Sequence, residues 1–236
     1  MKEITIKIIY DNCKENHALQ EGWGFSALIE ADDRKILFDT GNDRNAFFSN
    51  MEKMGIDYRE ITDVVFSHKH GDHTAGCKEI LEKLQESCRI YLPKGFPSKL
   101  VPQNLQIQTV SDFQEIEKNV YSMVLRAGIF LHEQVLILKM EKGLVIITGC
   151  AHPGIINILE AAQKRLKAPL YLVLGGFHLF RKNSRSIEEI VGQFQGLQVN
   201  KVAPCHCSGG TTIERFQETY HQDFYKIGTG SILTIS

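Results

Sequence analysis

The sequence predicts an α/β protein in which two sheets pack face to face with helices outside. Three observations favour this class. Apolar runs with β-like patterning dominate the first 40 residues and return in residues 105–147. From residue 154 onward, short buried strands alternate with helical segments. No low-complexity linker, proline-rich hinge or break in composition divides the chain, so we expect one domain spanning residues 1–236.

The first half of the chain is predicted to begin with strands. Asp32-Asp33-Arg34 form the turn of a hairpin, and Asp43 is placed to cap a helix that runs to Met54 and stops at Gly55. The expected strands are residues 3–10, 25–31, 35–39, 64–66 and 89–92. Residues 77–86 are predicted as a helix, and residues 11–22 and 93–102 as irregular segments.

The second half is predicted to begin with strands joined by a hairpin and to continue with alternating helices and strands. Glu141-Lys142-Gly143 is a plausible hairpin turn, and Thr211 with Glu214 forms a candidate capping box for the last helix. The expected strands are residues 120–126, 135–140, 144–148, 170–174, 199–203 and 231–235. The expected helices are residues 154–166, 186–195 and 211–220.

Composition excludes several classes of protein. With 43% hydrophobic and 23% charged residues the chain is ordinary globular material. A formal net charge of −1 argues against nucleic-acid or membrane-surface partners, and no apolar run is long enough for a transmembrane helix. The N-terminal segment has the pattern of a strand rather than a signal peptide. Six scattered cysteines indicate reduced thiols, so we expect a cytoplasmic protein. Because the composition argues against nucleic-acid and membrane partners, we expect its partner to be a small-molecule substrate.

The most informative stretch follows the apolar strand at residues 64–66. It contains three imidazoles and one carboxylate within six residues: His68, His70, Asp72 and His73. Side chains two apart in extended backbone project the same way, so His68 and His70 can reach one ion. Imidazole and carboxylate ligands suit zinc, iron or manganese better than magnesium or calcium. The pattern therefore predicts a metal site.

Three later strands repeat the same design of an apolar strand, a tight turn and a histidine. These histidines are His152, His178 and His206. Because ligand sites form beyond the carboxyl ends of strands, we expect all of these positions to contribute to one site. His17, His132 and His221 lack this context and are not expected to bind metal. Cys150, Cys205 and Cys207 are either thiolate ligands or small residues of tight turns.

Phe38-Asp39-Thr40-Gly41 and His68-Lys69-His70-Gly71-Asp72-His73 resemble the signature of the metallo-β-lactamase-fold superfamily. The resemblance implies a four-layer αββα sandwich with one or two divalent ions, zinc above all, at one edge of the sheets. It assigns His68 and His70 to one metal, with His152 completing that set. It assigns Asp72, His73 and His206 to a second metal, and gives Asp39 the task of orienting the ligands. Cys150 stands where the superfamily usually has a bridging aspartate.

The motifs around Cys150, Gly175 and His206 look like a narrower branch, described as dihydropteroate-synthase-like. Its members include 7,8-dihydropterin-6-methyl-4-(β-D-ribofuranosyl)aminobenzene-5′-phosphate synthases. The leading interpretation is a metal-dependent hydrolase of an ester, phosphoester or related substrate, phosphorylated or pterin-like. In it Asp72 orients the attacking water and His178 contacts substrate or protonates the leaving group. The alternatives are a pterin-condensing synthase and a non-hydrolytic metal or redox-sensing module that uses the thiols.

Overall fold

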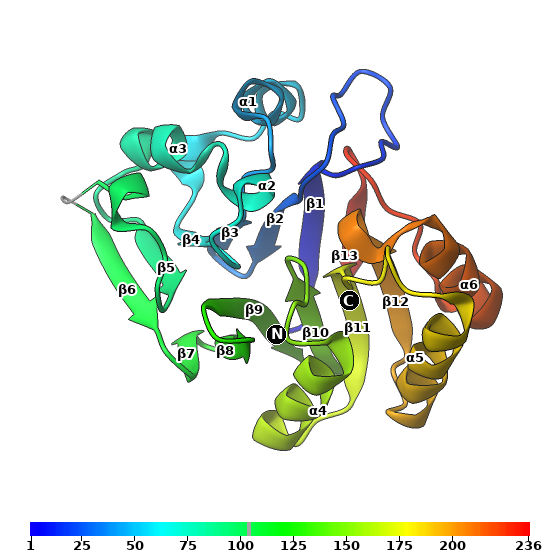
Figure 1. The fold of residues 1–236 in the computed structure, drawn as a ribbon. Helices are drawn as coiled ribbons and strands as arrows, with labels where there is room; N and C mark the ends of the chain where they lie inside the picture. Colours follow the sequence, from blue (N-terminus) through cyan, green and yellow to red (C-terminus); the bar gives the residue numbers. More distant parts are fainter. Residues whose placement is uncertain (103–104) are drawn as a thin grey trace. The chain divides into compact units, whose positions relative to one another are not determined.

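The computed structural model of the chain describes residues 1–102 and 105–236. They form two compact units, each built on one β-sheet (Figure 1). The first unit contains Met1–Ser111 and Ile227–Ser236, and the second contains Asp112–Lys226. A single domain over the whole chain stays a prediction.

The first unit has a seven-stranded sheet with the order β13-β1-β2-β3-β4-β5-β6. From β13 to β3 neighbouring strands are antiparallel, and from β3 to β6 they are parallel. The carboxyl ends of β3 and β4 therefore lie at the same edge of this sheet. The strands are β1 (Ile4–Tyr10), β2 (Ser26–Ala31), β3 (Arg34–Phe38), β4 (Asp63–Val65), β5 (Arg89–Pro93), β6 (Gln106–Val110) and β13 (Ile232–Ile235).

Helices of the first unit bury their apolar sides against this sheet. Asp43 caps α1 as predicted, since its carboxylate accepts hydrogen bonds from the backbone N–H groups of Asn45 and Ala46. Phe47 and Met51 of α1 join Ile80 and Leu81 of α3 in the core. The helices are α1 (Arg44–Lys53), α2 (Gly71–Thr74) and α3 (Cys77–Lys83), with 3-10 turns η1 (Tyr58–Glu60) and η2 (Ser98–Leu100).

The second unit has a six-stranded sheet with the order β12-β11-β10-β9-β8-β7. Strands β7 to β10 are antiparallel, whereas β10, β11 and β12 are parallel and end at one edge. The strands are β7 (Phe113–Glu117), β8 (Val120–Ala127), β9 (Leu131–Met140), β10 (Gly143–Thr148), β11 (Leu170–Gly176) and β12 (Lys201–Cys205). The helices are α4 (Ile155–Leu166), α5 (Ser184–Gly196) and α6 (Gly210–Tyr220), with η3 (His206–Ser208) and η4 (His221–Asp223).

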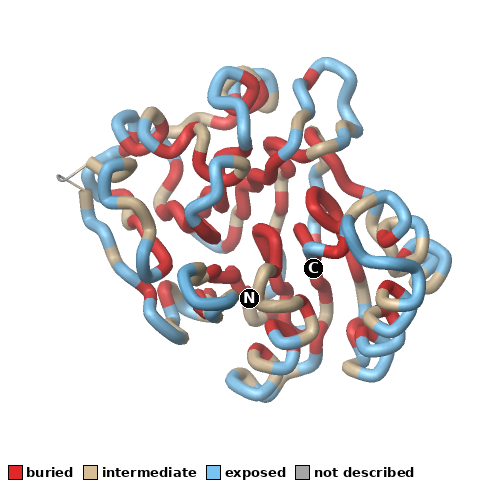
Figure 2. The backbone as a smooth tube through the Cα atoms, in the orientation of Figure 1, coloured by how far each residue is buried: buried red, intermediate tan, exposed pale blue. Residues whose placement is uncertain are grey.

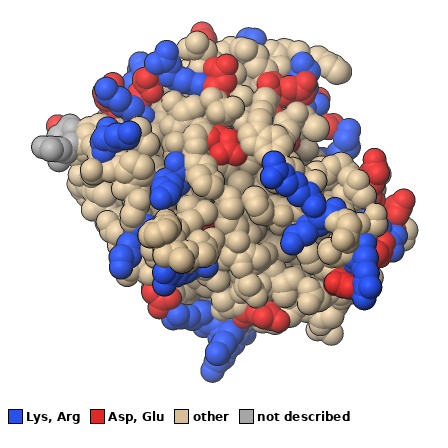
Figure 3. All heavy atoms as spheres, in the orientation of Figure 1, with Lys and Arg blue, Asp and Glu red and all other residues tan. Residues whose placement is uncertain are grey.

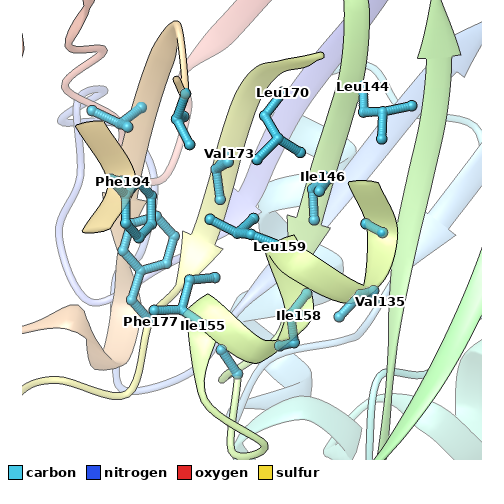
Figure 4. Close-up of a cluster of buried hydrophobic side chains, with 14 of the residues drawn as sticks. Val135, Leu144, Ile146, Ile155, Ile158, Leu159, Leu170, Val173, Phe177 and Phe194 are labelled. Carbon is cyan, nitrogen blue, oxygen red and sulfur yellow. The ribbon is translucent and has the colours of Figure 1, made fainter. Parts of the chain in front are cut away.

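The core of the second unit lies between its sheet and these helices (Figure 4). Ile155, Ile158 and Leu159 recur at helical spacing along the buried side of α4. Phe177 packs at 5.4 Å from Phe194, measured between ring centroids. Figure 2 shows the matching burial pattern, with strands largely buried and helices exposed on one side. Since β10 is buried along its whole length, both of its faces are covered.

The predicted elements are present, with two differences of physical interest. The capping box at Thr211 and Glu214 is wrong, because α6 begins one residue earlier and its N-cap is Gly209, with no side-chain cap. Gly209 has a φ of 84°, which is unfavourable for other residues. The helix predicted over residues 77–86 ends at Lys83, because the backbone turns extended at Leu84. Among the helices of the described segments, none has the length and apolar character needed to span a bilayer.

Candidate metal centre

In the first unit the ends of β3 and β4 bring Asp39 next to the histidine cluster. Phe38 pairs with Val65 across these parallel strands, so Asp39 faces the residues that follow β4. Asp39 is fully buried, and its φ of 57° turns the chain sharply at this point. Because a buried carboxylate must be hydrogen-bonded, its partners define the architecture of this half of the site.

The Asp39 carboxylate accepts three hydrogen bonds. Oδ1 accepts one from the backbone N–H of Ser67 at 2.7 Å, and Oδ2 accepts one from the Ser67 hydroxyl at 2.5 Å. Oδ2 also lies 2.7 Å from Nδ1 of His73, which donates its proton to the carboxylate. This places the proton of His73 on Nδ1 and leaves Nε2 as a lone pair, the arrangement that metal-binding histidines use. The orienting role that the resemblance gives to Asp39 would need a contact of this kind, and that role stays a prediction.

Ser67 connects the same carboxylate to a second histidine. Its hydroxyl proton is directed to Asp39, and its oxygen lies 2.9 Å from Nδ1 of His68. His68 can therefore donate from Nδ1 and present a lone pair on Nε2. That Nε2 lies 3.0 Å from Nδ1 of His70, so the two ring nitrogens converge on one place. A pair of imidazole nitrogens arranged in this way suits one divalent cation.

Asp72 completes the cluster of the first unit. It lies in the first turn of α2, whose N-cap is His70. His68, His70 and Asp72 each offer one ligand atom, and these atoms all lie within 4.8 Å of one another. Oδ2 of Asp72 lies 3.7 Å from Nε2 of His73 and accepts a hydrogen bond from Nε1 of Trp23 at 3.0 Å. The first unit thus gathers the residues that the sequence predicted for it.

In the second unit the carboxyl ends of β10, β11 and β12 carry the other predicted residues. Pairing of Thr148 with Gly175 and of Gly176 with Cys205 keeps the three ends in register. Gly176 is required by the close approach of the chains, since a Cβ there would lie 2.3 Å from the Gly149 oxygen. The residues gathered beyond these strand ends are Cys150, His152, His178, His206 and Cys207.

Glu133, which the sequence did not single out, organises this second group. It projects from β9, is fully buried, and accepts four hydrogen bonds. Oε1 accepts from the backbone N–H groups of Cys150 at 2.8 Å and Ala151 at 2.7 Å. Oε2 lies 2.8 Å both from the N–H of His152 and from its Nδ1. Glu133 therefore holds the loop after β10 and leaves Nε2 of His152 as a lone pair.

The thiols lie among the imidazoles. Sγ of Cys150 is 3.3 Å from Nε2 of His206, and Sγ of Cys207 lies 3.5 Å from the backbone oxygen of Cys150. Ligand atoms of Cys150, His178 and Cys207 lie within 4.8 Å of one another. Burial raises the pKa of Cys207, but hydrogen bonds with Cys150 and His178 outweigh it and hold that pKa well below its usual range. Cys207 is thus placed, with Cys150 and His178, where it could bind a metal ion.

His178 lies at the exposed side of this group. Its ring centroid is 4.4 Å from that of His152. A side-chain hydrogen bond with Cys207 raises the pKa of His178 above its ordinary value, against the opposing effect of burial. Its φ of 56° lies in the left-handed region, two residues beyond the end of β11. The remaining histidines differ, because His17 and His221 are exposed and His132 pairs across the sheet with Arg126.

Comparisons with known proteins agree with this picture. The sequence profile of the anti-Pycsar protein Apyc1 matches residues 17–130. The crystal structure of Tm1679, a metal-dependent hydrolase of the β-lactamase superfamily, is similar at a TM-score of 0.83 and 29% identity, over 99% of both chains. The chain has the metallo-β-lactamase fold, and its solved structural neighbours are proteins of that superfamily. The fold class predicted from the sequence is thereby confirmed.

Two further proteins are similar to this chain over most of its length. The metallo-β-lactamase-fold protein YhfI from Bacillus subtilis shares the fold at a TM-score of 0.71 and 11% identity, over 98% of this chain and 99% of YhfI. The 7,8-dihydropterin-6-methyl-4-(β-D-ribofuranosyl)-aminobenzene-5′-phosphate synthase of Methanocaldococcus jannaschii is 24% identical over 89% of each chain. The resemblance to the synthase-containing branch, noted from the sequence, is confirmed as a likeness to this protein.

Three residues that contact the candidate metal ligands escaped the sequence analysis. Ser67 and Glu133 orient histidines, and Trp23 binds Asp72. The available signal was a carboxylate inside the apolar run of β9, because a buried charge needs partners. Sequence alone could not name those partners, since Glu133 and Cys150 are 17 residues apart and meet only across paired strands.

Proposed function

We propose that this protein is a metal-dependent hydrolase that binds one or two divalent ions and acts on an ester, phosphoester or related small molecule. The resemblance assigns His68, His70 and His152 to one ion, and Asp72, His73 and His206 to the other. Imidazole and carboxylate ligands, with Cys150 as an additional thiolate, fit zinc best and also allow manganese or iron. The similarity to a metal-dependent hydrolase of the same superfamily supports the general class.

One observation carries the proposal. Each unit buries a carboxylate that accepts a hydrogen bond from Nδ1 of a candidate ligand, Asp39 from His73 and Glu133 from His152. This contact selects the tautomer with a free lone pair on Nε2 and makes that nitrogen more basic. A protein that used these histidines only as turn or core residues would gain nothing from burying two charges behind them.

The residues of the chain have distinct roles in this hydrolase. A bound ion would lower the pKa of water from about 15.7 toward about 7 and polarise the bond under attack. Asp72, held by Trp23, would accept a hydrogen bond from the attacking water and orient it. His178, with its raised pKa and exposed position, would donate a proton to the leaving group.

Elemental analysis tests the proposal. Wild-type protein is compared with His68→Ala and His152→Ala, using the exposed His221→Ala as the matched control. About two zinc, manganese or iron ions per chain, reduced in both site variants and unchanged in the control, would support a binuclear site. About one ion per chain would indicate that Cys150 does not replace the bridging aspartate. No retained metal after reconstitution, with no hydrolysis of aryl phosphates or esters, would refute the proposal.

A cavity of about 230 Å³ in the second unit favours a substrate with an apolar part and an acidic group. His152 and His178 lie in its wall, and most other lining residues are apolar, among them Ile155, Phe177 and Leu179. Lys182 contributes a positive charge. The cavity therefore favours a phosphorylated small molecule as substrate.

The basic run of Arg181, Lys182 and Arg185 offers a matched test of this substrate class. Only Lys182 lines the cavity, whereas Arg181 lies over the ring of Phe180 and Arg185 pairs with Glu189. We expect Lys182→Gln to raise the KM for an aryl phosphate but not for the corresponding neutral ester. Arg185→Gln should change neither value. Equal effects of the two substitutions would show that the cavity does not recognise phosphate.

The face of the protein drawn in Figure 3 gives no support to a polyanionic partner. On the face shown in Figure 3, basic and acidic side chains are interspersed, as expected for a net charge of −1. We therefore propose an enzyme that acts on a small molecule rather than on nucleic acid or membranes, and the scattered cysteines favour a cytoplasmic location.

The second candidate function is condensation, which the likeness to the Methanocaldococcus jannaschii synthase favours. A condensing enzyme would use the same residues, with His178 or a bound ion stabilising a departing pyrophosphate. The two functions differ in their need for a second substrate. Consumption of a pterin pyrophosphate that depends strictly on an added arylamine would identify a synthase, and consumption without the amine would identify a hydrolase.

A further inference from the structure

Trp23 is the one tryptophan of the chain, and its side chain reaches the candidate metal centre of the first unit. Its indole Nε1–H donates a hydrogen bond of 3.0 Å to Oδ2 of Asp72. The side chain is nevertheless 45% exposed, which is unusual for so large an apolar group. A hydrogen bond to a carboxylate is stronger than one between neutral groups, so this contact restrains Asp72.

The backbone that follows Trp23 is bound to the segment that contains Asp72. Phe25 donates its N–H to the backbone oxygen of Asp72 at 3.2 Å, and the oxygen of Phe25 accepts from Gly41 at 3.0 Å. Gly24 makes this approach possible, because its φ is 151° and a Cβ there would lie 2.5 Å from the Asp72 oxygen. The indole is therefore attached to a backbone that cannot move independently of Asp72.

Asp72 needs such a restraint. It belongs to α2, a helix of only four residues, which by itself gives its side chain little support. Its carboxylate must face His68 and His70 for the three ligand atoms to stay within 4.8 Å of one another. A rotation about χ1 would move the carboxylate out of this group.

We propose that Trp23 is a positioning residue, whose indole N–H holds the Asp72 carboxylate in the rotamer that binds metal and orients water. The inference rests on the proposed function for its consequences, but its structural part can be tested without metal or substrate. It predicts that the N–H group of Trp23 matters, rather than the bulk of its ring.

The first experiment examines the contact itself. Because the chain has one tryptophan, its ¹⁵N–¹H spectrum contains a single indole cross-peak. In metal-free protein, that proton should be protected from exchange with solvent, and the peak should move in the Asp72→Ala variant. The inference would be overturned if the indole proton exchanged freely with solvent and its cross-peak did not move in Asp72→Ala. This outcome does not depend on the activity of the enzyme.

The second experiment measures the consequence, using Co²⁺ as the probe. Trp23→Phe keeps an aromatic ring without the donor, and Trp23→His restores an N–H donor on a smaller ring. We expect Trp23→Phe to weaken Co²⁺ binding about tenfold or more, as is typical for partners of metal ligands, and to lower kcat with little change in KM. Trp23→His should recover part of both losses. Phe48→Leu, which removes another partly buried aromatic ring of the first unit, is the matched control.

The outcomes separate the inference from the proposed function. Equal Co²⁺ affinity and kcat in wild type and Trp23→Phe would overturn the inference while leaving the hydrolase intact. Equal losses in Trp23→Phe and Trp23→His would also overturn it, since the N–H would then be irrelevant. If wild-type protein bound no Co²⁺ at all, the proposed function would fail, and the indole cross-peak would still decide whether Trp23 holds Asp72.

Discussion

Asp39 in the first unit and Glu133 in the second each bind Nδ1 of a candidate metal-binding histidine, at 2.7 Å from His73 and 2.8 Å from His152. Their other partners differ. Asp39 is bound by one backbone N–H and by the hydroxyl of Ser67, whereas Glu133 is bound by three successive backbone N–H groups. Asp39 thus orients side chains, and Glu133 shapes a segment of the main chain.

The difference lies in which partners can adjust. A hydroxyl rotates and an imidazole changes its tautomer, so partners of Asp39 can respond to a change of acceptor. A backbone N–H can only donate. Replacing each carboxylate by its amide should therefore affect stability in the second unit and ligand chemistry in the first.

The largest effect is expected for Glu133→Gln. The amide NH₂ would face either two backbone donors or the His152 donors, so at least one buried N–H loses its acceptor. Each such loss costs about 1–3 kcal/mol, and we expect the free energy of unfolding to fall by about 2–4 kcal/mol. Urea denaturation measures this change. A loss below about 1 kcal/mol would show that the loop after β10 does not depend on Glu133.

Asp39→Asn should change stability less and metal binding strongly. The amide NH₂ would donate to Nδ1 of His73, which moves the imidazole proton to Nε2 and blocks it as a ligand. We expect a loss of metal affinity of about 10–100-fold. Competition with a chromogenic chelator measures it.

Asp63→Asn provides the control for loss of a buried carboxylate in the same unit. Asp63 is 2% exposed and pairs with Arg89, away from the histidines. This variant should lose stability and keep its metal affinity. Equal metal loss in Asp63→Asn and Asp39→Asn would mean that general destabilisation, rather than the tautomer of His73, explains the effect.

Ser67→Ala tests how Asp39 acts on His68 in the first unit. It removes the link between Asp39 and His68 but leaves the contact with His73 intact. We expect metal affinity to fall about tenfold, at the lower end of the range for such partners, and the alanine variant to fold normally. Calorimetric titration with zinc measures the change, and an affinity equal to that of wild type would show that Ser67 does not orient His68.

The smallest effect concerns the pH dependence set by Cys207. His178 has a raised pKa, so its proton is present below that pKa and is lost as pH rises through it. If His178 is the proton donor, kcat should fall on this alkaline limb. The same raised pKa stabilises the fold fully below the ordinary histidine value near 6.5 and progressively less as pH rises through the folded pKa.

Cys207→Ser removes the largest cause of the raised pKa and should move the alkaline limb of kcat to lower pH. Cys205→Ser, at a buried neighbouring position outside that hydrogen bond, is the control and should leave the limb in place. pH–rate profiles of the three proteins make the measurement. If the alkaline limb of kcat did not move in Cys207→Ser, Cys207 would not be the cause of the raised pKa of His178.

Most helices and strands, and the histidines that follow strand ends, were predictable from local sequence pattern. An apolar strand followed by a turn and a histidine recurs at residues 68, 152, 178 and 206, and within each sheet parallel strands bring their carboxyl ends to the same edge. Asp39 was predictable only through the resemblance. The Thr211 cap failed because a glycine with positive φ started the helix instead, and local propensity cannot rank these two solutions.

The sequence by itself determined where strands end, which of those ends carry histidines, and therefore the resemblance to the superfamily. Only the tertiary structure decided which groups stand behind the ligands. Ser67 is adjacent to His68, yet its role depends on Asp39 from another strand. Trp23 lies 49 residues from Asp72, and Glu133 lies 19 residues from His152. Patterns with periods of 2 and 3.6 determine which face of an element is buried, whereas such hydrogen bonds depend on how separate elements pack.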